Sequence, residues 1–208
     1  MKSRVTIIDY GMGNIWSIKN ALAYLGWDSN VVDTPNHVLS ADMIILPGVG
    51  SYRQAMSTLL EKKLDKAILE LASIKKRKIL GICLGMQLMA SAGEEDGGAI
   101  GLQLIPGIAE HFDKSLLSKG LKVPHVGFNE VKGDGSSILF KGNYAPTDFY
   151  FTHSYRIPSD IGGGYHGICD YGEMFLASYE SDNIFATQFH PEKSQTNGLR
   201  LLNNFLRA

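Results

Sequence analysis

The sequence has few cysteines and no long apolar segment. Among its 208 residues are two cysteines, Cys83 and Cys169, which lie far apart and outside any CxxC or Cys/His spacing typical of a zinc site. No apolar stretch approaches the roughly 20 residues of a membrane-spanning helix, and the apolar start from Arg4 to Ile8 is too short for the core of a signal peptide. We therefore expect a cytoplasmic protein with no metal, no disulfide and no contact with a membrane.

The charged residues carry no excess of one sign. Twenty Lys and Arg residues stand against 21 Asp and Glu residues, which leaves a net charge of −1 and no field that would attract nucleic acid. A phosphate P-loop and a dinucleotide GxGxxG motif are also missing from the sequence. We therefore expect neither a cofactor nor a nucleic-acid partner. With 44% hydrophobic residues, the chain is predicted to form one globular domain over residues 1–208.

Strand-like and helix-like segments alternate in the first half of the chain. Strands are predicted at 5–8, 28–32, 43–46 and 78–82, and helices at 17–25, 52–60 and 65–75. Such alternation favours an α/β fold with a mostly parallel central sheet flanked by helices, because each crossover must return the chain to the same edge. From about residue 120, short strand-like segments such as 149–151 and 184–187 indicate an antiparallel extension. A closing helix is predicted at 198–206.

The residues around Cys83 are typical of a nucleophile. The sequence Gly81-Ile82-Cys83-Leu84-Gly85 follows a predicted strand and precedes a helix-forming run, which is the layout of a nucleophile elbow with Cys in place of Ser. The small flanking residues permit a tight turn, and backbone N–H groups at the start of the helix can hold an oxyanion. The alternative is a buried cysteine that behaves as a small hydrophobic residue. The flanking glycines favour the catalytic interpretation.

A general base is predicted at His190. Phe189-His190-Pro191-Glu192 follows the strand predicted at 184–187, and residues i and i+2 of an extended segment point the same way, so the Glu192 carboxylate can reach the His190 ring. In that arrangement His190 takes the proton of Cys83 and Glu192 fixes the histidine tautomer. The alternative for His190 and Glu192 is a surface ion pair. For the other histidines, including His153, structural hydrogen bonding is the default interpretation.

Seven motifs resemble those of one family. They are IDYGMGN at 8–14, LPGVG at 46–50, GICLGMQ at 81–87, PHVGFNEV at 124–131, THSY at 152–155, QFHPEKS at 188–194 and GLRLLNNF at 198–205. Together they look like the glutaminase subunit of imidazole glycerol phosphate synthase, a class I glutamine amidotransferase. The resemblance implies the three-layer fold of that class and hydrolysis of L-glutamine to glutamate and ammonia. It also implies a heterodimer with a (β/α)8 barrel cyclase, which uses the ammonia to make imidazole glycerol phosphate and AICAR in histidine biosynthesis.

The resemblance also implies roles for individual residues. Cys83 would be the nucleophile, His190 the base and Glu192 its orienting group, in agreement with the interpretation of the motifs themselves. Backbone amides of Val49 or Gly50, together with Leu84, would form the oxyanion hole. Contacts with glutamine would come from Gly48, Gln87, Glu95, His153, Ser154 and Tyr155, with Glu95 meeting the amino group. The surface that faces the partner would include Asn14, Val126, Phe128, Asn129 and Lys193.

Three departures from the family pattern leave alternatives open. Val126 and Phe128 replace the Met and Trp of the usual PHMGWN motif, and Tyr52 stands where Phe is common. Because the PHMGWN loop faces the partner in this family, the chain could instead serve a related synthase that amidates a surface-polysaccharide sugar. A catalytically silent interaction subunit and a stand-alone cysteine hydrolase are two further alternatives. The intact Cys83, His190 and Glu192 argue against the first, and the partner-type motifs argue against the second.

Overall fold

The computed structural model describes residues 5–142 and 145–208. The strands are β1 (Val5–Ile8), β2 (Ser29–Val32), β3 (Met43–Leu46), β4 (Lys78–Ile82), β5 (Ala92–Gly93), β6 (Ala99–Ile100), β7 (Ile108–His111), β8 (His125–Gly133), β9 (Thr147–His153), β10 (Tyr155–Arg156), β11 (Tyr165–Asp170), β12 (Met174–Ser181) and β13 (Ile184–Thr187). The helices are α1 (Ile15–Tyr24), α2 (Pro35–Leu39), α3 (Tyr52–Glu61), α4 (Leu64–Leu69), α5 (Leu84–Met89), α6 (Ser115–Ser118) and α7 (Gln195–Arg207), with a π-helical turn η1 (Glu70–Ile74) and the 3-10 turns η2 (Glu95–Gly97) and η3 (Pro191–Lys193).

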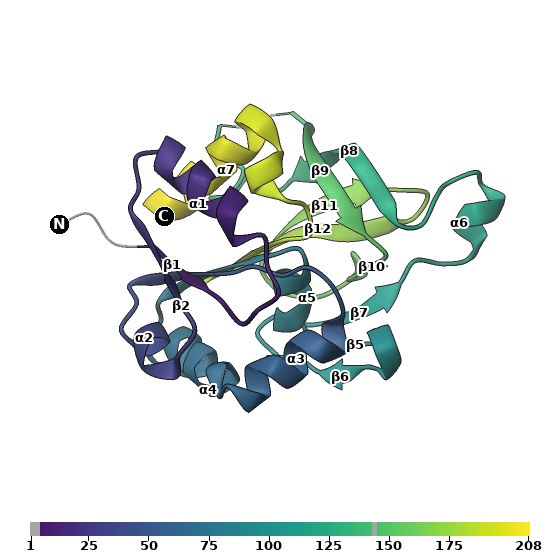
Figure 1. The fold of residues 1–208 in the computed structure, drawn as a ribbon. Helices are drawn as coiled ribbons and strands as arrows, with labels where there is room; N and C mark the ends of the chain where they lie inside the picture. The colour runs from purple at the N-terminus through teal and green to yellow at the C-terminus, as the bar shows by residue number, and fades with distance from the viewer. Residues whose placement is uncertain (1–4, 143–144) are drawn as a thin grey trace.

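The central sheet has a parallel half and an antiparallel half. Within the described residues its nine strands lie in the order β2-β1-β3-β4-β13-β12-β11-β8-β9. The first five of these are parallel to one another, whereas the pairings from β13 to β9 are antiparallel. The predicted α/β class with an antiparallel extension is therefore confirmed. A small four-stranded sheet, in the order β10-β7-β5-β6, lies beside α3 and α5 (Figure 1).

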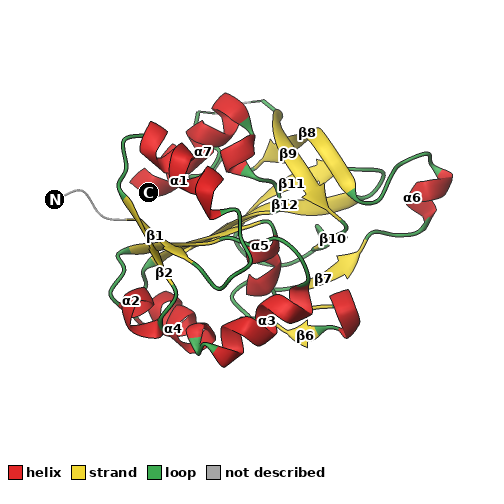
Figure 2. Ribbon diagram, in the orientation of Figure 1, coloured by secondary structure: helices red, strands yellow, loops and turns green. Residues whose placement is uncertain are grey.

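Helices cover both faces of the sheet, as Figure 2 shows. On one face α1 and α7 contribute Leu22 and Phe205 to a core that contains many aromatic rings. On the other face α2, α3, α4 and α5 pack over a second core, to which Leu59 and Ile68 belong. All four of these side chains are fully buried. Burial of such side chains stabilises the fold by about 1.5–3 kcal/mol each relative to exposure.

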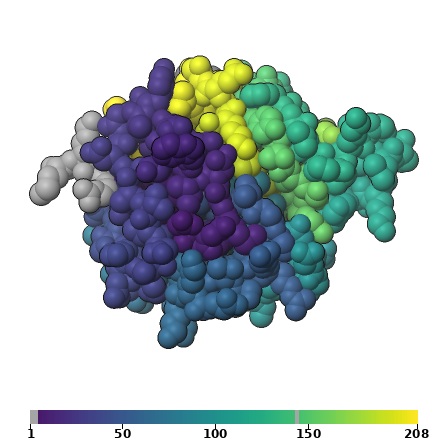
Figure 3. All heavy atoms as spheres, in the orientation of Figure 1, coloured from purple at the N-terminus to yellow at the C-terminus, as the bar shows by residue number. Residues whose placement is uncertain are grey.

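The predicted helix bounds differ from the structure mainly at one place. The segment predicted as a single helix over 65–75 is divided into α4 and the π-helical turn η1. Elsewhere the helices begin or end within about three residues of the predicted positions, which is the usual uncertainty of bounds set by a fraying end. The segment around α6 projects from the rest of the molecule (Figures 1 and 3). Among the described residues, no helix combines the length and the apolar character needed to cross a membrane.

The register of the sheet brings together two distant parts of the chain. β13 pairs in parallel with β4, with Thr187 opposite Ile82, so the two strands end side by side at one edge. The backbone N–H of Cys83, directly after β4, donates to the carbonyl of Thr187 at 2.8 Å. Loops at the carboxyl ends of parallel strands form the usual binding crevice of open α/β sheets. Cys83 and the residues after β13 therefore meet at the expected edge.

Candidate active site

Cys83 sits on a strained turn between β4 and α5. Its φ of 54° and ψ of −111° lie in a region that non-glycine residues rarely adopt. The turn is tight because Gly85 approaches β3: a Cβ on Gly85 would lie 1.9 Å from the carbonyl oxygen of Leu46. Glycine is required at that position because no side chain fits. The elbow predicted from the glycine spacing is therefore present in the backbone, with the thiol almost completely buried.

His190 and Glu192 form a buried pair. The Nδ1 atom of His190 lies 2.8 Å from Oε1 of Glu192, and the two side chains are 2% and 1% exposed. The sequence predicted an extended segment from His190 to Glu192. That prediction is wrong, because Glu192 belongs to the 3-10 turn η3. His190 is extended and Glu192 folds back toward it around Pro191, which occupies the first position of the turn. The contact is the expected one, but a turn produces it.

The environment of His190 favours the protonated ring. Burial by itself lowers the pKa, but the charge of Cys83 and the bond to Glu192 outweigh it and raise the pKa of His190 to about 10. Within the described residues, the buried Nε2 atom of His190 has no hydrogen-bond partner of its own. Nε2 is therefore the ring nitrogen that remains available for proton exchange.

Ser194 fixes the position of this turn against the sheet. Its hydroxyl donates to the carbonyl of His190 at 2.6 Å and accepts from the backbone N–H of Tyr150 at 2.9 Å. The N–H of His190 donates in turn to the carbonyl of Tyr150 at 2.9 Å. One buried hydroxyl thus continues the hydrogen bonding of β9 onto the turn. The backbone N–H and the carbonyl of His190 are therefore both hydrogen-bonded, which fixes the residue that carries the imidazole.

A pocket of about 310 Å³ opens in front of Cys83. Eight of the residues expected around the glutamine site line it together with Cys83: Val49, Gly50, Leu84, Gln87, Glu95, His153, Ser154 and Tyr155. These residues come from the loop after β3, from α5, from η2 and from the segment that joins the end of β9 to the start of β10. Gly48 is not part of this wall. It lies behind the elbow, where a Cβ would approach the Tyr10 hydroxyl to 2.6 Å and the N–H of Gly85 to 2.9 Å.

The Gly48–Gly50 loop holds its Val49 amide away from the pocket. The N–H of Val49 donates to the carbonyl of Met12 at 3.4 Å, and the Tyr10 hydroxyl donates to the carbonyl of Pro47 at 2.9 Å. Gly50 has a φ of +100°, a conformation open to glycine. The expectation of a Val49 donor to an oxyanion therefore does not hold in this conformation. A rotation of the peptide before Val49 would be needed to direct that N–H toward Cys83.

Two residues expected to bind glutamine are already engaged within the protein. Glu95 accepts from the backbone N–H of Tyr52 at 2.7 Å through Oε2, which places its carboxylate at the start of α3. The Nε2 atom of Gln87 donates to the carbonyl of Tyr155 at 2.8 Å and to Oε1 of Gln188 at 2.9 Å. Both side chains are thereby fixed on the pocket wall.

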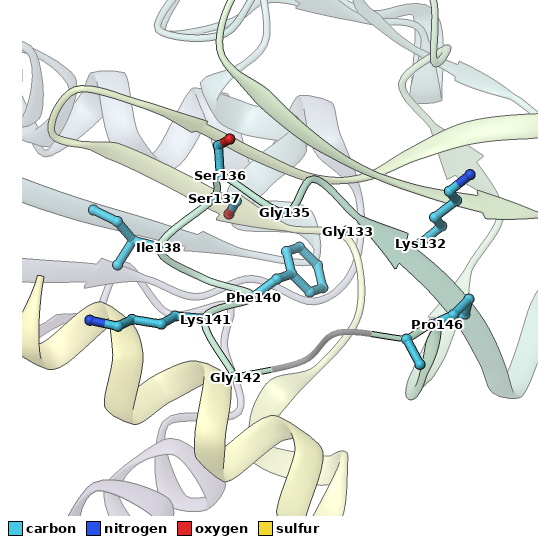
Figure 4. A pocket seen from close by; sticks show the side chains of 11 residues that line it. Lys132, Gly133, Gly135, Ser136, Ser137, Ile138, Phe140, Lys141, Gly142 and Pro146 are labelled. Carbon is cyan, nitrogen blue, oxygen red and sulfur yellow. The ribbon is translucent and has the colours of Figure 1, made fainter.

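Another hollow on the surface lacks the chemistry of the pocket at Cys83. A cavity of about 560 Å³ is formed by the loop that follows β8, and its residues include Lys132, Ser137 and Lys141. Figure 4 shows the two lysine side chains pointing away from each other. The buried carboxylate nearby, Glu180, accepts from the Ser137 hydroxyl and from two backbone N–H groups, so its hydrogen bonds serve the loop itself. The pocket at Cys83 is the candidate active site.

Comparison with known proteins agrees with this geometry. Residues 6–208 match the family described as Glutamine amidotransferase class-I. The chain belongs to the class I glutamine amidotransferases. The resemblance inferred from the motifs and the prediction of an enzyme are thereby confirmed. A solved structure of a glutamine amidotransferase superposes with a TM-score of 0.74 at 16% identity, covering 98% of this chain and 97% of that one. PurLQS from Thermotoga maritima gives a TM-score of 0.73 at 18% identity and covers 100% and 99%.

Relatives with higher identity come from one branch of the amidotransferases. An imidazole glycerol phosphate synthase subunit HisH of Moorella thermoacetica is 44% identical over 201 residues, covering 97% of this chain and 93% of the relative. Subunit HisH 1 of Parasynechococcus marenigrum is 42% identical over 211 residues, with 98% and 97% covered. The imidazole glycerol phosphate synthase hisHF of Arabidopsis thaliana is 44% identical over 207 residues, which are 98% of this chain and 34% of that protein.

The residues expected to face a partner lie in two environments in this amidotransferase. Val126 and Phe128 are 57% and 50% exposed on β8, and Phe128 stacks edge-on against Tyr150 of β9. The Nζ atom of Lys193 lies 5.8 Å from the centre of the same Tyr150 ring. Asn129 differs, because its amide donates to the carbonyl of Asp170 on β11. Asn14 precedes α1 and is half-buried.

Three functional candidates were missed in the sequence. Gln188 and Ser194 belong to the QFHPEKS motif, but the motif itself does not reveal that their side chains bond to Cys83 and to the His190 turn. Tyr10 is buried behind the Gly48–Gly50 loop, where burial and the charge of Cys83 raise its pKa. The signal available in the sequence was that all three residues lie within family motifs. Those motifs contain more polar residues than a turn requires.

Proposed function

We propose that this chain hydrolyses L-glutamine to glutamate and ammonia with Cys83 as nucleophile, His190 as acid and base, and Glu192 as the group that orients His190. The observation that carries the proposal is that Cys83 and the buried His190–Glu192 pair stand at the adjacent ends of β4 and β13, and that Cys83 lines a pocket. A nucleophile, a base and an orienting carboxylate in this order form the triad of covalent acyl transfer.

The reaction would proceed in two steps. The Cys83 thiolate attacks the side-chain carboxamide carbon, and the imidazolium of His190 gives its proton to the departing nitrogen, so that ammonia leaves and a thioester remains. A water molecule then attacks the thioester carbon while His190 takes one of its protons, and glutamate leaves with the thiolate restored. The raised pKa of His190 supports this sequence, because it keeps the proton on the ring for the first step.

We further propose that the ammonia passes to a (β/α)8 barrel cyclase in a cytoplasmic heterodimer that makes imidazole glycerol phosphate and AICAR in histidine biosynthesis. The support is that relatives covering nearly all of the chain are subunits of imidazole glycerol phosphate synthase. The exposed Val126 and Phe128 on β8 fit a protein partner. We propose a single domain over residues 1–208, and no cofactor enters this reaction.

The position of Val49 suggests that the partner controls the rate. With its N–H bonded to Met12, one oxyanion donor is misdirected, and removing such a donor typically costs about 10²- to 10³-fold in turnover. We expect glutamate release to be low in the isolated chain and to rise when the synthase carries its own substrate. Docking would turn the peptide before Val49 toward Cys83.

The test is steady-state glutamate release by the free chain, by the complex with the barrel synthase, and by the complex with synthase substrate. Cys83→Ala should abolish glutamine-dependent product formation and leave synthesis from added ammonium salts intact, because the thiol acts only before ammonia is free. Glutamate release by Cys83→Ala at the parental rate would refute the proposal. Full activity of the free chain would favour a stand-alone hydrolase, and activation by a sugar-amidating synthase alone would refute the pathway.

A further inference from the structure

The sulfur of Cys83 is contacted from behind by a buried amide. Gln188, directly after β13, is 0% exposed, and its Nε2 atom donates to Sγ of Cys83 at 3.7 Å. Its backbone N–H is engaged with the carbonyl of Ala177 at 2.8 Å, which fixes the residue on the sheet. The thiol of Cys83 can also donate to the carbonyl of Thr152, at 3.9 Å. Once the thiol has lost its proton, the bond to Thr152 is lost and the one from Gln188 is kept.

The orientation of the Gln188 amide is determined by its neighbours. The carbonyl of Tyr155 can only accept, so the side-chain atom of Gln87 that lies 2.8 Å from it must be the amide nitrogen. The same nitrogen faces Gln188 at 2.9 Å, so the atom of Gln188 at that contact must be the oxygen Oε1. The nitrogen of Gln188 is therefore left to face the sulfur. A flipped amide would set two nitrogens against each other.

Two buried histidines belong to the same hydrogen-bond network as Gln87 and Gln188. The Nδ1 atom of His153 lies 2.8 Å from the same Tyr155 carbonyl, so it carries the proton. Its Nε2 atom must then accept from Nδ1 of His125 at 3.1 Å. Burial lowers the pKa of His153 to about 3 and that of His125 to about 4, so both rings are neutral near pH 7. No member of the network can rotate without breaking a buried hydrogen bond, which makes the position of Gln188 rigid.

We propose that Gln188 is a positioning residue, which holds the Cys83 sulfur in place and stabilises its negative charge through the N–H of its side chain. This inference rests on the proposed function of Cys83 as the nucleophile. A hydrogen bond to a charged acceptor is stronger than one to a neutral acceptor, so the contact favours the thiolate over the thiol. It is weaker again in the thioester, where the sulfur is uncharged, and it is restored when the thiolate leaves.

The test is the pH dependence of Cys83 alkylation by iodoacetamide, measured without glutamine from about pH 5 to pH 10 and followed by mass spectrometry of the Cys83 peptide. In Gln188→Met the donor is lost at nearly constant side-chain volume. A hydrogen bond to a charged group contributes about 1.5–3 kcal/mol, so we expect the midpoint of the profile to move up by about one unit or more. At pH values below both midpoints, Gln188→Met should be alkylated at least about tenfold more slowly than the parental chain. At pH values above both midpoints, the two alkylation rates should be equal.

Controls separate this effect from a loss of shape. Gln188→Leu also removes the N–H and adds no charge, so its midpoint should also rise, and it carries the test if Gln188→Met does not fold. Gln54→Met, on the exposed side of α3, should leave the profile unchanged. Cys169, whose pKa burial raises to about 12, is followed as a separate peptide in the same digest.

Two results would overturn the inference. An unchanged midpoint in a folded Gln188 variant would show that the amide does not act on the charge of the sulfur. A rate that falls by the same factor at every pH would show a displaced or shielded sulfur instead. The alkylation assay needs neither glutamine nor a partner. The two proposals can therefore fail separately. If the alkylation midpoint shifts in Gln188→Met but the parental protein does not hydrolyse glutamine, the proposed function is refuted and the role of Gln188 stands.

Discussion

Replacing Gly198 with alanine is expected to destabilise the protein, although alanine is the better helix former. Gly198 lies in the first turn of α7, directly behind the turn that carries His190 and Glu192. A Cβ at this position would lie 1.9 Å from the carbonyl oxygen of Pro191 and 2.7 Å from its carbonyl carbon. These are backbone atoms, so no rotation of a flexible side chain can relieve the contact. The helix and the η3 turn would have to separate.

The two opposing contributions can be compared. Alanine in place of glycine in a helix interior gains about 1 kcal/mol. Overpacking costs typically about 1–3 kcal/mol and occasionally more, and a contact that is more than about 1 Å too close belongs at the upper end. The net loss is about 2 kcal/mol, which lowers the melting temperature of a domain of this size by roughly 4–8 °C. A displacement of about 1 Å at His190 would also reduce turnover by about 10²-fold.

Both quantities can be measured on one preparation. Thermal unfolding of Gly198→Ala would be compared with the parental chain and with Thr196→Ala, an exposed position in the same helix. Thr196→Ala should gain a few tenths of a kcal/mol from helix propensity alone. Glutamate release would be measured in the complex with the synthase, where the active site is expected to be complete. A Gly198→Ala protein that melts at or above the parental temperature would refute the reasoning, since helix propensity would then have prevailed over the close contact.

Two further predictions concern the buried polar groups. Glu192→Gln should reduce glutamate release less than Cys83→Ala, because an orienting group tunes the base whereas the nucleophile forms the covalent bond. If substitutions of His190 and of Glu192 both leave glutamate release almost unchanged, the pair has a structural role. Tyr52→Phe should leave the melting temperature unchanged or raise it, because the buried Tyr52 hydroxyl has no partner within the described residues and an unsatisfied polar group costs about 1–3 kcal/mol. A clear drop in melting temperature would show that this hydroxyl has a partner in solution.

Much of the fold could be predicted because its signals are local. Each predicted strand in the first half is a short apolar run, and four of these runs lie within one residue of β1, β2, β3 and β4. The glycines around Cys83 likewise predicted the elbow, since only glycine permits the approach of Gly85 to Leu46. The split of the helix at η1 was not predictable, because an apolar spacing near 3.6 residues does not distinguish an α-helix from a π-helical turn.

The geometry of the site was predictable only in part. His190 and Glu192 are two residues apart, so their contact could be expected from their separation, yet the conformation that makes it is a turn and not an extended strand. The orientation of the Val49 amide depends on Met12, which lies 37 positions earlier in the chain. The family pattern suggested a donor to the oxyanion and could not reveal which way that peptide faces.

The sequence by itself indicated the members of the proposed triad: a cysteine between glycines after one strand, and a histidine and a glutamate after another. The tertiary structure alone decided that these groups meet, because the parallel register of β13 on β4 sets Thr187 beside Cys83 across a separation of more than 100 residues. It also decided the direction of each buried donor. The amide of Gln188 faces the sulfur because a carbonyl at Tyr155 fixes Gln87 first. Such constraints arise between residues that are distant in sequence, where spacing carries no information.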